Sequence, residues 1–224
     1  MPFDPERIAV FAVFMLVLLL SLSWHESAHA WMADRLGDYT ARYMGRVSLN
    51  PLVHIDIIGT IVFPAINFFW GVPLLGWAKP TPVNPLHLRD KRYGQLRVAA
   101  AGPISNCILA VIFIIADKAL VILSPLFSTN VLTPMFLFFQ LAIYLNIGLA
   151  VFNLIPIPPL DGSHILEALL PYEAAQKFQG IQRYGGILLM LMVFTPVFSI
   201  IYSPVLIFLR YLFYWFNLPM PVRW

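Results

Sequence analysis

Residues 21–31, SLSWHESAHAW, place three ionisable side chains, His25, Glu26 and His29, in a stretch that is otherwise apolar or small. The whole apolar stretch, residues 8–32, would measure roughly 37 Å as a helix at about 1.5 Å per residue, enough to cross a bilayer core of about 30 Å. A charged side chain near the middle of a membrane helix costs roughly 2.5–3.5 kcal/mol on insertion scales. The three side chains therefore need a partner that offsets this cost.

The spacing of the two histidines predicts a metal ion as that partner. His25 and His29 are four residues apart, so in a helix both imidazoles project from one face and can bind one tetrahedral zinc ion. Glu26 beside them would be the general base of a metal-dependent hydrolase. In a soluble protein, two surface histidines and a solvated glutamate would be the default explanation of this pattern. In a membrane helix, the cost of burial favours the metal site over a structural polar cluster.

The composition predicts an all-α integral membrane protein. Of the 224 residues, 60% are hydrophobic and only 11% are charged, against about 25% charged in soluble domains. We expect one domain, residues 1–224, built as a polytopic helical bundle with about four to six membrane segments. The net charge of +3 comes from basic residues beside the spans, so we expect the lipid bilayer as a partner and no nucleic acid.

Hydropathy divides the chain into four expected spans and one irregular apolar segment. The irregular segment, residues 55–70, is short and is interrupted by Gly59 and Pro64. We expect it to form a membrane-embedded hairpin after the first span, either re-entrant or β-like with an extended backbone. The last span contains Pro196 and Pro204, so it is either one kinked helix or two shorter pieces. The expected spans are residues 8–32, 98–122, 135–154 and 186–216.

The distribution of basic residues predicts the orientation of the bundle. Ten of the fourteen Lys and Arg residues lie in the polar stretches 33–97 and 155–185. Because cytoplasmic loops carry the excess of positive charge, these stretches should face the cytoplasm. We therefore expect a multi-pass protein of the cell (inner) membrane, with the histidine pair toward its cytoplasmic side.

A third zinc ligand must come from a distant part of the sequence, because a catalytic zinc keeps three protein ligands and one open position. Asp161 is our candidate, since it follows the proline-broken end of the third span on the expected cytoplasmic side. Asp161 could instead be the N-cap of a short helix that begins near Ser163. Its position alone leaves both interpretations open.

Two motifs together resemble the site-2 protease family of intramembrane zinc metalloproteases. They are HESAH at residues 25–29 and NLIPIPPLDG at residues 153–162. The runs at residues 48–60 and 101–106 are similar to the compact subgroup of this family, which lacks PDZ and CBS domains. The resemblance implies one zinc ion per chain, with Glu26 as general base and with the ligands His25, His29 and Asp161.

The resemblance also implies a substrate and the residues that would position it. The substrate would be a transmembrane helix of another membrane protein, cut in or near the membrane. Asn153 would hold or polarise the scissile carbonyl, and Asn106 is a second candidate for this role. His54 either lines the path of substrate or water, or has a hydrogen-bonded structural role.

Two other functions compete with this one. A prenyl-protein peptidase would need a glutamate ligand in a later span, and Glu167 and Glu173 fit poorly because they follow the third span. A non-proteolytic membrane metal-binding or transport protein would need polar residues across several spans to form a path. Asp117 and Lys118 are the only other charged pair within an expected span.

Overall fold

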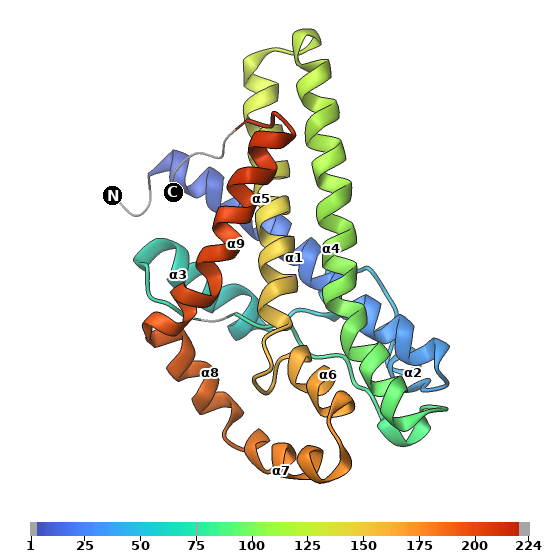
Figure 1. Ribbon diagram of the computed structural model, residues 1–224. Helices are drawn as coiled ribbons and strands as arrows, with labels where there is room; N and C mark the ends of the chain where they lie inside the picture. The colour runs from blue at the N-terminus through green and yellow to red at the C-terminus, as the bar shows by residue number, and fades with distance from the viewer. Residues whose placement is uncertain (1–3, 75, 220–224) are drawn as a thin grey trace.

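The computed structural model describes residues 4–74 and 76–219, and its regular secondary structure is entirely helical. Four of the helices in these ranges are long and apolar enough to cross a membrane. Figure 1 shows α4 and α5 side by side, with α1 crossing behind them and α9 in front of α5. The all-α, polytopic class is therefore confirmed. The four helices are α1 (Pro5–Arg35), α4 (Lys91–Leu123), α5 (Thr129–Asn153) and α9 (Pro196–Trp215).

Local sequence signals explain where the first two of these helices begin. Asp4 caps α1 by accepting a hydrogen bond from the Arg7 N–H (2.9 Å), and Pro5 occupies the first turn, where its missing N–H costs nothing. Asp90 caps α4 in the same way through the N–H groups of the second and third helical residues. Because of this cap, α4 starts seven residues before the apolar stretch that begins at residue 98.

The last apolar stretch consists of two helices. The chain breaks at Thr195, whose extended backbone precedes Pro196, because a proline disfavours the helical conformation of the residue before it. Of the two helices, only α9 is long enough to span a membrane. The shorter helices are α2 (Thr40–Tyr43), η1 (Pro51–Val53), η3 (Pro85–His87), η4 (Ser124–Leu126), α6 (Asp161–Leu169), α7 (Tyr172–Gln182) and α8 (Gly185–Phe194).

The segment expected as a hairpin is helical, so its β-like alternative was wrong. A π-helix, η2 (Ile57–Val62), continues directly into α3 (Phe63–Trp70). Gly59 does not interrupt it, because the Asp56 carboxylate caps the start by accepting the Gly59 N–H (2.8 Å). Pro64 lies in the first turn of α3, where a proline is tolerated.

The chain instead runs out along α1 and back (Figure 1), through an outward arm that is mostly helical (residues 54–70) and a return arm without regular secondary structure (residues 71–74 and 76–81). His54 lies against Ser27 near the end of α1. The outward arm reaches the start of α1, where the Arg7 guanidinium donates to the Phe68 carbonyl (2.9 Å). The return arm brings the Thr81 N–H to the Glu26 carboxylate (2.8 Å). The arrangement has the re-entrant path, with one helical arm and one arm without regular secondary structure (Figure 1).

A buried carboxylate connects the end of α1 to the segment that precedes α4. Asp38 is 0% exposed and accepts hydrogen bonds from the Thr40 N–H (3.0 Å), the Asn84 N–H (2.7 Å) and His87 Nδ1 (3.4 Å). Burial raises the pKa of the Asp38 carboxyl. A hydrogen bond from the Thr40 hydroxyl and the three bonds just named lower it by more, so the pKa lies below its ordinary value.

We expect Asp38→Asn to lower the free energy of unfolding by about 1–3 kcal/mol at pH 7, because an amide cannot accept all of these bonds. The folded-state pKa is below the unfolded value of about 3.9, so the stabilisation is present above that pH and is lost as the pH falls through the folded-state pKa. The difference in thermal unfolding midpoint between wild type and variant in detergent should therefore shrink below about pH 4. A difference that stays constant to lower pH would contradict this account.

Candidate metal centre

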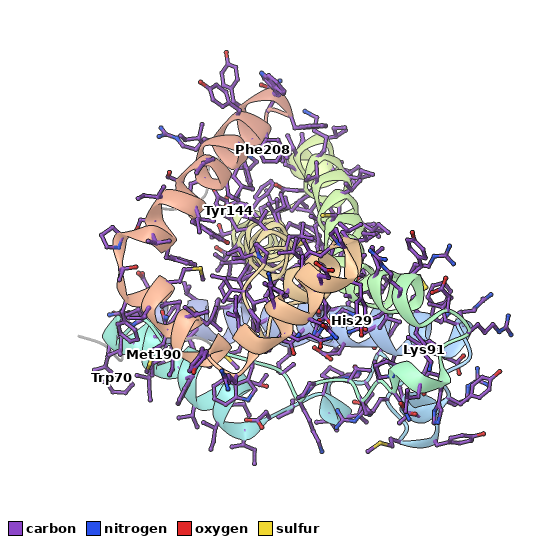
Figure 2. All side chains as sticks on the ribbon, turned by 60° about the horizontal axis from the view of Figure 1, so that its bottom comes forward. His29, Trp70, Lys91, Tyr144, Met190 and Phe208 are labelled. Carbon is purple, nitrogen blue, oxygen red and sulfur yellow. The ribbon has the colours of Figure 1, made fainter. Side chains whose placement is uncertain are left out.

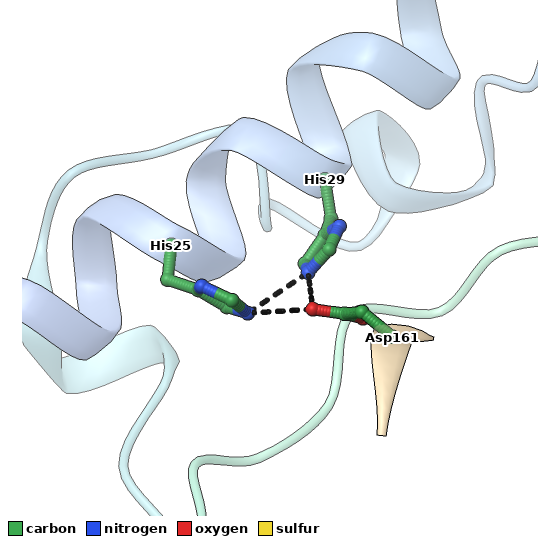
Figure 3. Close-up of side chains that lie close together, drawn as sticks. All are labelled: His25, His29 and Asp161. Carbon is green, nitrogen blue, oxygen red and sulfur yellow. Dashed lines mark hydrogen bonds and ion pairs between the residues drawn. The ribbon is translucent and has the colours of Figure 1, made fainter. Parts of the chain in front are cut away.

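Three atoms that could ligate a metal ion converge at one point from two distant helices. His25 and His29 lie on α1, and Asp161 is the first residue of α6 (Figure 3). The two imidazole Nε2 atoms are 3.0 Å apart, and Asp161 Oδ2 lies 3.1 Å from the first and 3.3 Å from the second. The histidines are 4% and 7% exposed. The structure thus brings together the three residues that the sequence analysis selected as ligands.

The opposite nitrogen of each imidazole fixes the protonation of the ring. His29 Nδ1 donates to the Val98 carbonyl (2.7 Å), and His25 Nδ1 donates to Asn106 Oδ1 (2.5 Å). Because these oxygens can only accept, each Nδ1 carries a hydrogen, and a neutral ring then has its lone pair on Nε2. Both lone pairs face the common point.

Asp161 faces the same point as an anion. Burial raises the pKa of its carboxyl, but the adjacent imidazoles of His25 and His29 lower it more, so the group stays ionised at neutral pH. Its Oδ2 atom is buried and makes no hydrogen bond of ordinary geometry. The N-cap interpretation was wrong, because the cap residue of α6 is Leu160 and the cap involves no side-chain hydrogen bond.

These three atoms fit a zinc ion. Tetrahedral zinc with bonds of about 2.0–2.1 Å holds its ligand atoms about 3.3 Å apart, close to the separations seen here. A proton on one Nε2 can join only two of the three atoms, whereas a cation at the common point contacts all three.

Helix α4 closes over the two histidines at a glycine. A Cβ atom added to Gly102 would lie 2.4 Å from His29 Nε2 and 2.6 Å from His25 Cε1. Only a residue without a side chain lets α4 approach α1 this closely, which is the usual role of small residues between membrane helices.

A buried amide network holds His25 from behind. Asn106 is 0% exposed, and its Nδ2 donates to Asn146 Oδ1 (2.8 Å), while Asn146 Nδ2 donates to Ser21 Oγ (2.9 Å). The observed contact of Asn106 is therefore with a histidine rather than with an open surface where a substrate could bind. The sequence analysis missed Asn146, although an amide inside a membrane span is costly unless bonded and could have identified it.

The Glu26 carboxylate is held by the return arm. Its Oε2 accepts the Thr81 N–H (2.8 Å), and the Thr81 hydroxyl donates to the Glu26 carbonyl (3.0 Å). Glu26 is half-buried and close enough to His29 for the two groups to interact electrostatically. No signal in the sequence identified Thr81, because it lies between two prolines in a loop that carries no motif.

Within the described part of the chain, Asn153 and His54 make no hydrogen bond to the residues around the centre. Asn153 is the last residue of α5, and its Nδ2 donates to the Leu149 carbonyl one turn earlier (3.0 Å). His54 is 2% exposed, and its Nε2 donates to the Ser48 carbonyl (2.8 Å). His54 contacts Ser27, which is about 200° around α1 from His25, so it packs on the opposite face of the helix.

An arginine fixes the helix that carries Asp161. Arg92, in the first turn of α4, donates from Nε to the Ala168 carbonyl (2.6 Å) and from Nη2 to the Leu170 carbonyl (2.7 Å). A cation at the C-terminal carbonyls of α6 also complements the helix dipole. Arg92 therefore anchors the end of α6 opposite to Asp161.

A mostly apolar groove of about 1170 Å³ leads away from the centre. Its walls are formed by α1, the two arms of the re-entrant segment, α5 and α9. One end includes Leu22, a single turn before His25 on α1. The groove therefore extends from the neighbourhood of the metal centre between the spanning helices.

Comparisons with known proteins agree with this architecture. The model of "Peptidase family M50" matches residues 120–193. The protein "Putative zinc metalloprotease YwhC" of Bacillus subtilis is 37% identical over 196 residues, which cover 86% of this chain and 84% of that protein. "Putative zinc metalloprotease Rip2" of Mycolicibacterium smegmatis is 29% identical over 84% of this chain and 70% of its own length. No solved structure matches the chain.

With these relatives, the spanning helices and the buried centre define a multi-pass membrane zinc metalloendopeptidase. The chain belongs to peptidase family M50, the site-2 protease family, and its cofactor is zinc. This result favours proteolysis over the transport alternative.

We expect Gly102→Ala to reduce the zinc content of the purified protein by about tenfold or more, because the new methyl group would occupy space beside both imidazoles. Gly180→Ala in α7 is the matched control, since an added Cβ there meets nothing within 4 Å. Elemental analysis of both variants measures the effect. Equal zinc content in wild type and Gly102→Ala would show that α4 does not shape the centre.

We expect Asn106→Ala to weaken zinc binding by about 10–100-fold, because His25 would lose the acceptor that orients its ring. Competition with a chelator measures the affinity, and Asn130→Ala at the exposed start of α5 is the control. If zinc affinity is unchanged, the amide network has no part in orienting the ligand.

Proposed function

We propose that this protein is an intramembrane endopeptidase that cuts a peptide bond in or near a transmembrane helix of another membrane protein. The observation that carries the proposal is the position of the convergent centre on a spanning helix. His25 lies ten residues, or about 15 Å, before the end of α1 and about 30 Å from its start. A substrate bond must therefore enter the bundle to reach it.

The proposed roles follow from the contacts of each residue. His25, His29 and Asp161 would hold the zinc ion, which when bound polarises the scissile carbonyl and activates water. Glu26 would accept the proton of the attacking water and pass it to the leaving amine. The Thr81 N–H keeps the Glu26 carboxylate oriented while the Thr81 hydroxyl fixes the adjacent backbone.

Asn153 is proposed to stabilise the negative charge that develops on the substrate carbonyl. Its side chain extends from the last turn of α5, eight residues before Asp161. Its present hydrogen bond to the Leu149 carbonyl is a local one. Rotation about its side-chain torsions would free this N–H for the substrate, as amide side chains do in other hydrolases.

The substrate must unwind before it is cut, because the amides of a helix are bonded internally and its backbone is covered by side chains. The groove between α1, α5 and α9 offers a largely apolar environment for the part of the substrate that stays helical. Its end near Leu22 is where the unwound part would meet the centre.

We further propose that the centre faces the cytoplasm from the cell (inner) membrane. The end of α1 that carries the histidines is followed by the basic stretch 33–97, and α6 follows the end of α5 at the same side of the bundle. The positive-inside bias supports this orientation.

Zinc analysis combined with cleavage of a single-span test protein in detergent checks these roles. We expect Glu26→Gln to keep its zinc and to lose about 10²–10⁴-fold in cleavage rate, because only the proton acceptor is removed. Asp161→Ala should lose zinc and cleavage together. Asn153→Ala should keep zinc and lose about 10²–10³-fold in rate.

Glu173→Gln in α7 is the control for removing a carboxylate from the surface. Undiminished cleavage by Glu26→Gln, with zinc retained in Asp161→Ala, would mean that the centre is structural and would refute the proposed function.

A further inference from the structure

Among the residues that the structure describes, a single cation lines the end of the groove that lies away from the metal centre. Arg210 is on α9, fourteen residues after Pro196, and its side chain is exposed along the groove wall. The wall around it consists of the apolar and aromatic side chains of α1, α5 and α9, including Phe14 and Leu206. A guanidinium in such surroundings calls for an anionic partner.

No such partner occurs among residues 4–74 and 76–219, where no acidic side chain lies within ion-pair distance of Arg210. Tyr144 on α5 lines the same groove as Arg210. Tyr144 lies between α5 and α9 in Figure 2 and packs on Phe213, with ring centroids 5.4 Å apart. Arg210 is therefore part of the groove wall, beside aromatic side chains of α5 and α9.

The length of the groove matches a short helical segment. Along α9 it runs from Phe198 to Arg210, roughly 18 Å, and along α1 from Phe14 to Leu22, roughly 12 Å. A ligand that fills it would touch Arg210 at one end and approach the metal centre at the other. The two ends are separated by about three turns of helix.

We propose that Arg210 is a specificity-determining residue that binds a carboxylate side chain of the transmembrane substrate, about three helical turns from the bond that is cut. This inference rests on the proposed function. A planar guanidinium binds carboxylates through two parallel hydrogen bonds, and this interaction is strong where water is scarce. The groove would thus select helices with an acidic residue at a fixed distance from the cleavage site.

The position of the groove favours a peptide over a lipid as the occupant. An anionic phospholipid could offer a phosphate to the same guanidinium, and its chains would suit the apolar walls. However, the groove ends one turn from His25 and beside Gly76 on the return arm. A lipid seated along this length would block the path to the centre, whereas a substrate has to follow it.

Binding of synthetic single-span peptides tests the inference. The peptides differ only in having Glu, Gln or Lys at one position, which is moved in steps of one residue through the turn predicted to meet Arg210. The protein is the zinc-loaded Glu26→Gln form, so that no peptide is cut, in nanodiscs of phosphatidylcholine alone. The added variants are Arg210→Gln, Arg210→Glu and the control Arg183→Gln, which removes an exposed arginine at the end of α7 outside the groove.

We expect the Glu peptide to bind about tenfold more tightly than the Gln peptide in one register. The ratio should fall to about one in Arg210→Gln, should reverse in favour of the Lys peptide in Arg210→Glu, and should persist in Arg183→Gln. A ratio of one in every register, an unchanged ratio in Arg210→Gln, or no binding of any peptide overturns the inference. So does thermal stabilisation by phosphatidylglycerol that depends on Arg210 without any preference among the peptides, which would assign the site to a lipid.

Cleavage of the Gln peptide by the enzyme that retains Glu26 distinguishes a failure of the Arg210 role from a failure of the proposed function. If zinc-dependent cleavage occurs while the carboxylate preference is absent, only the role of Arg210 fails. If there is no zinc-dependent cleavage of any peptide, the proposed function itself fails.

Discussion

The convergence of three candidate metal-ligand atoms at one buried point is the constraint on which the rest of the structure depends. Two imidazole Nε2 atoms and one carboxylate oxygen lie 3.0–3.3 Å from one another. A proton can join only two of these atoms, whereas a cation contacts all three, and the surrounding helices are placed so that each donor keeps its direction. Binding of the ion and packing of the bundle are therefore parts of one equilibrium.

The helices around the centre supply hydrogen-bond partners for the imidazole Nδ1 atoms of both histidines. Helix α4 supplies the Val98 carbonyl and the Asn106 amide to the two rings, and α5 completes the amide chain with Asn146. Gly102 allows this close approach. In water, a side-chain amide can form hydrogen bonds with the solvent, but inside a bilayer it must form them with other protein groups. These hydrogen bonds therefore also define how α1, α4 and α5 pack.

The parts of the fold that sequence predicts are those governed by regular spacing. The apolar lengths predicted the spanning helices, and the four-residue spacing predicted that His25 and His29 would act together. Asp161 could not be separated from an N-cap by position, because both roles place an aspartate at a helix start. The β-like alternative for residues 55–70 failed because the cap supplied by Asp56 outweighs a glycine and a proline that usually interrupt helices. Thr81 reaches Glu26 only through the path of the re-entrant segment, which no local pattern encodes.

The separation of the ligands along the chain has a consequence for the synthesis of the protein. His25 and His29 enter the membrane with the first span, whereas Asp161 follows the third. Until the ribosome has produced α6, the growing chain holds two imidazoles and no carboxylate, so the centre cannot form. With the proposed ligand set, the enzyme therefore stays inactive until its third span and α6 have been synthesised. The order of its helices along the chain thus delays its proteolytic activity.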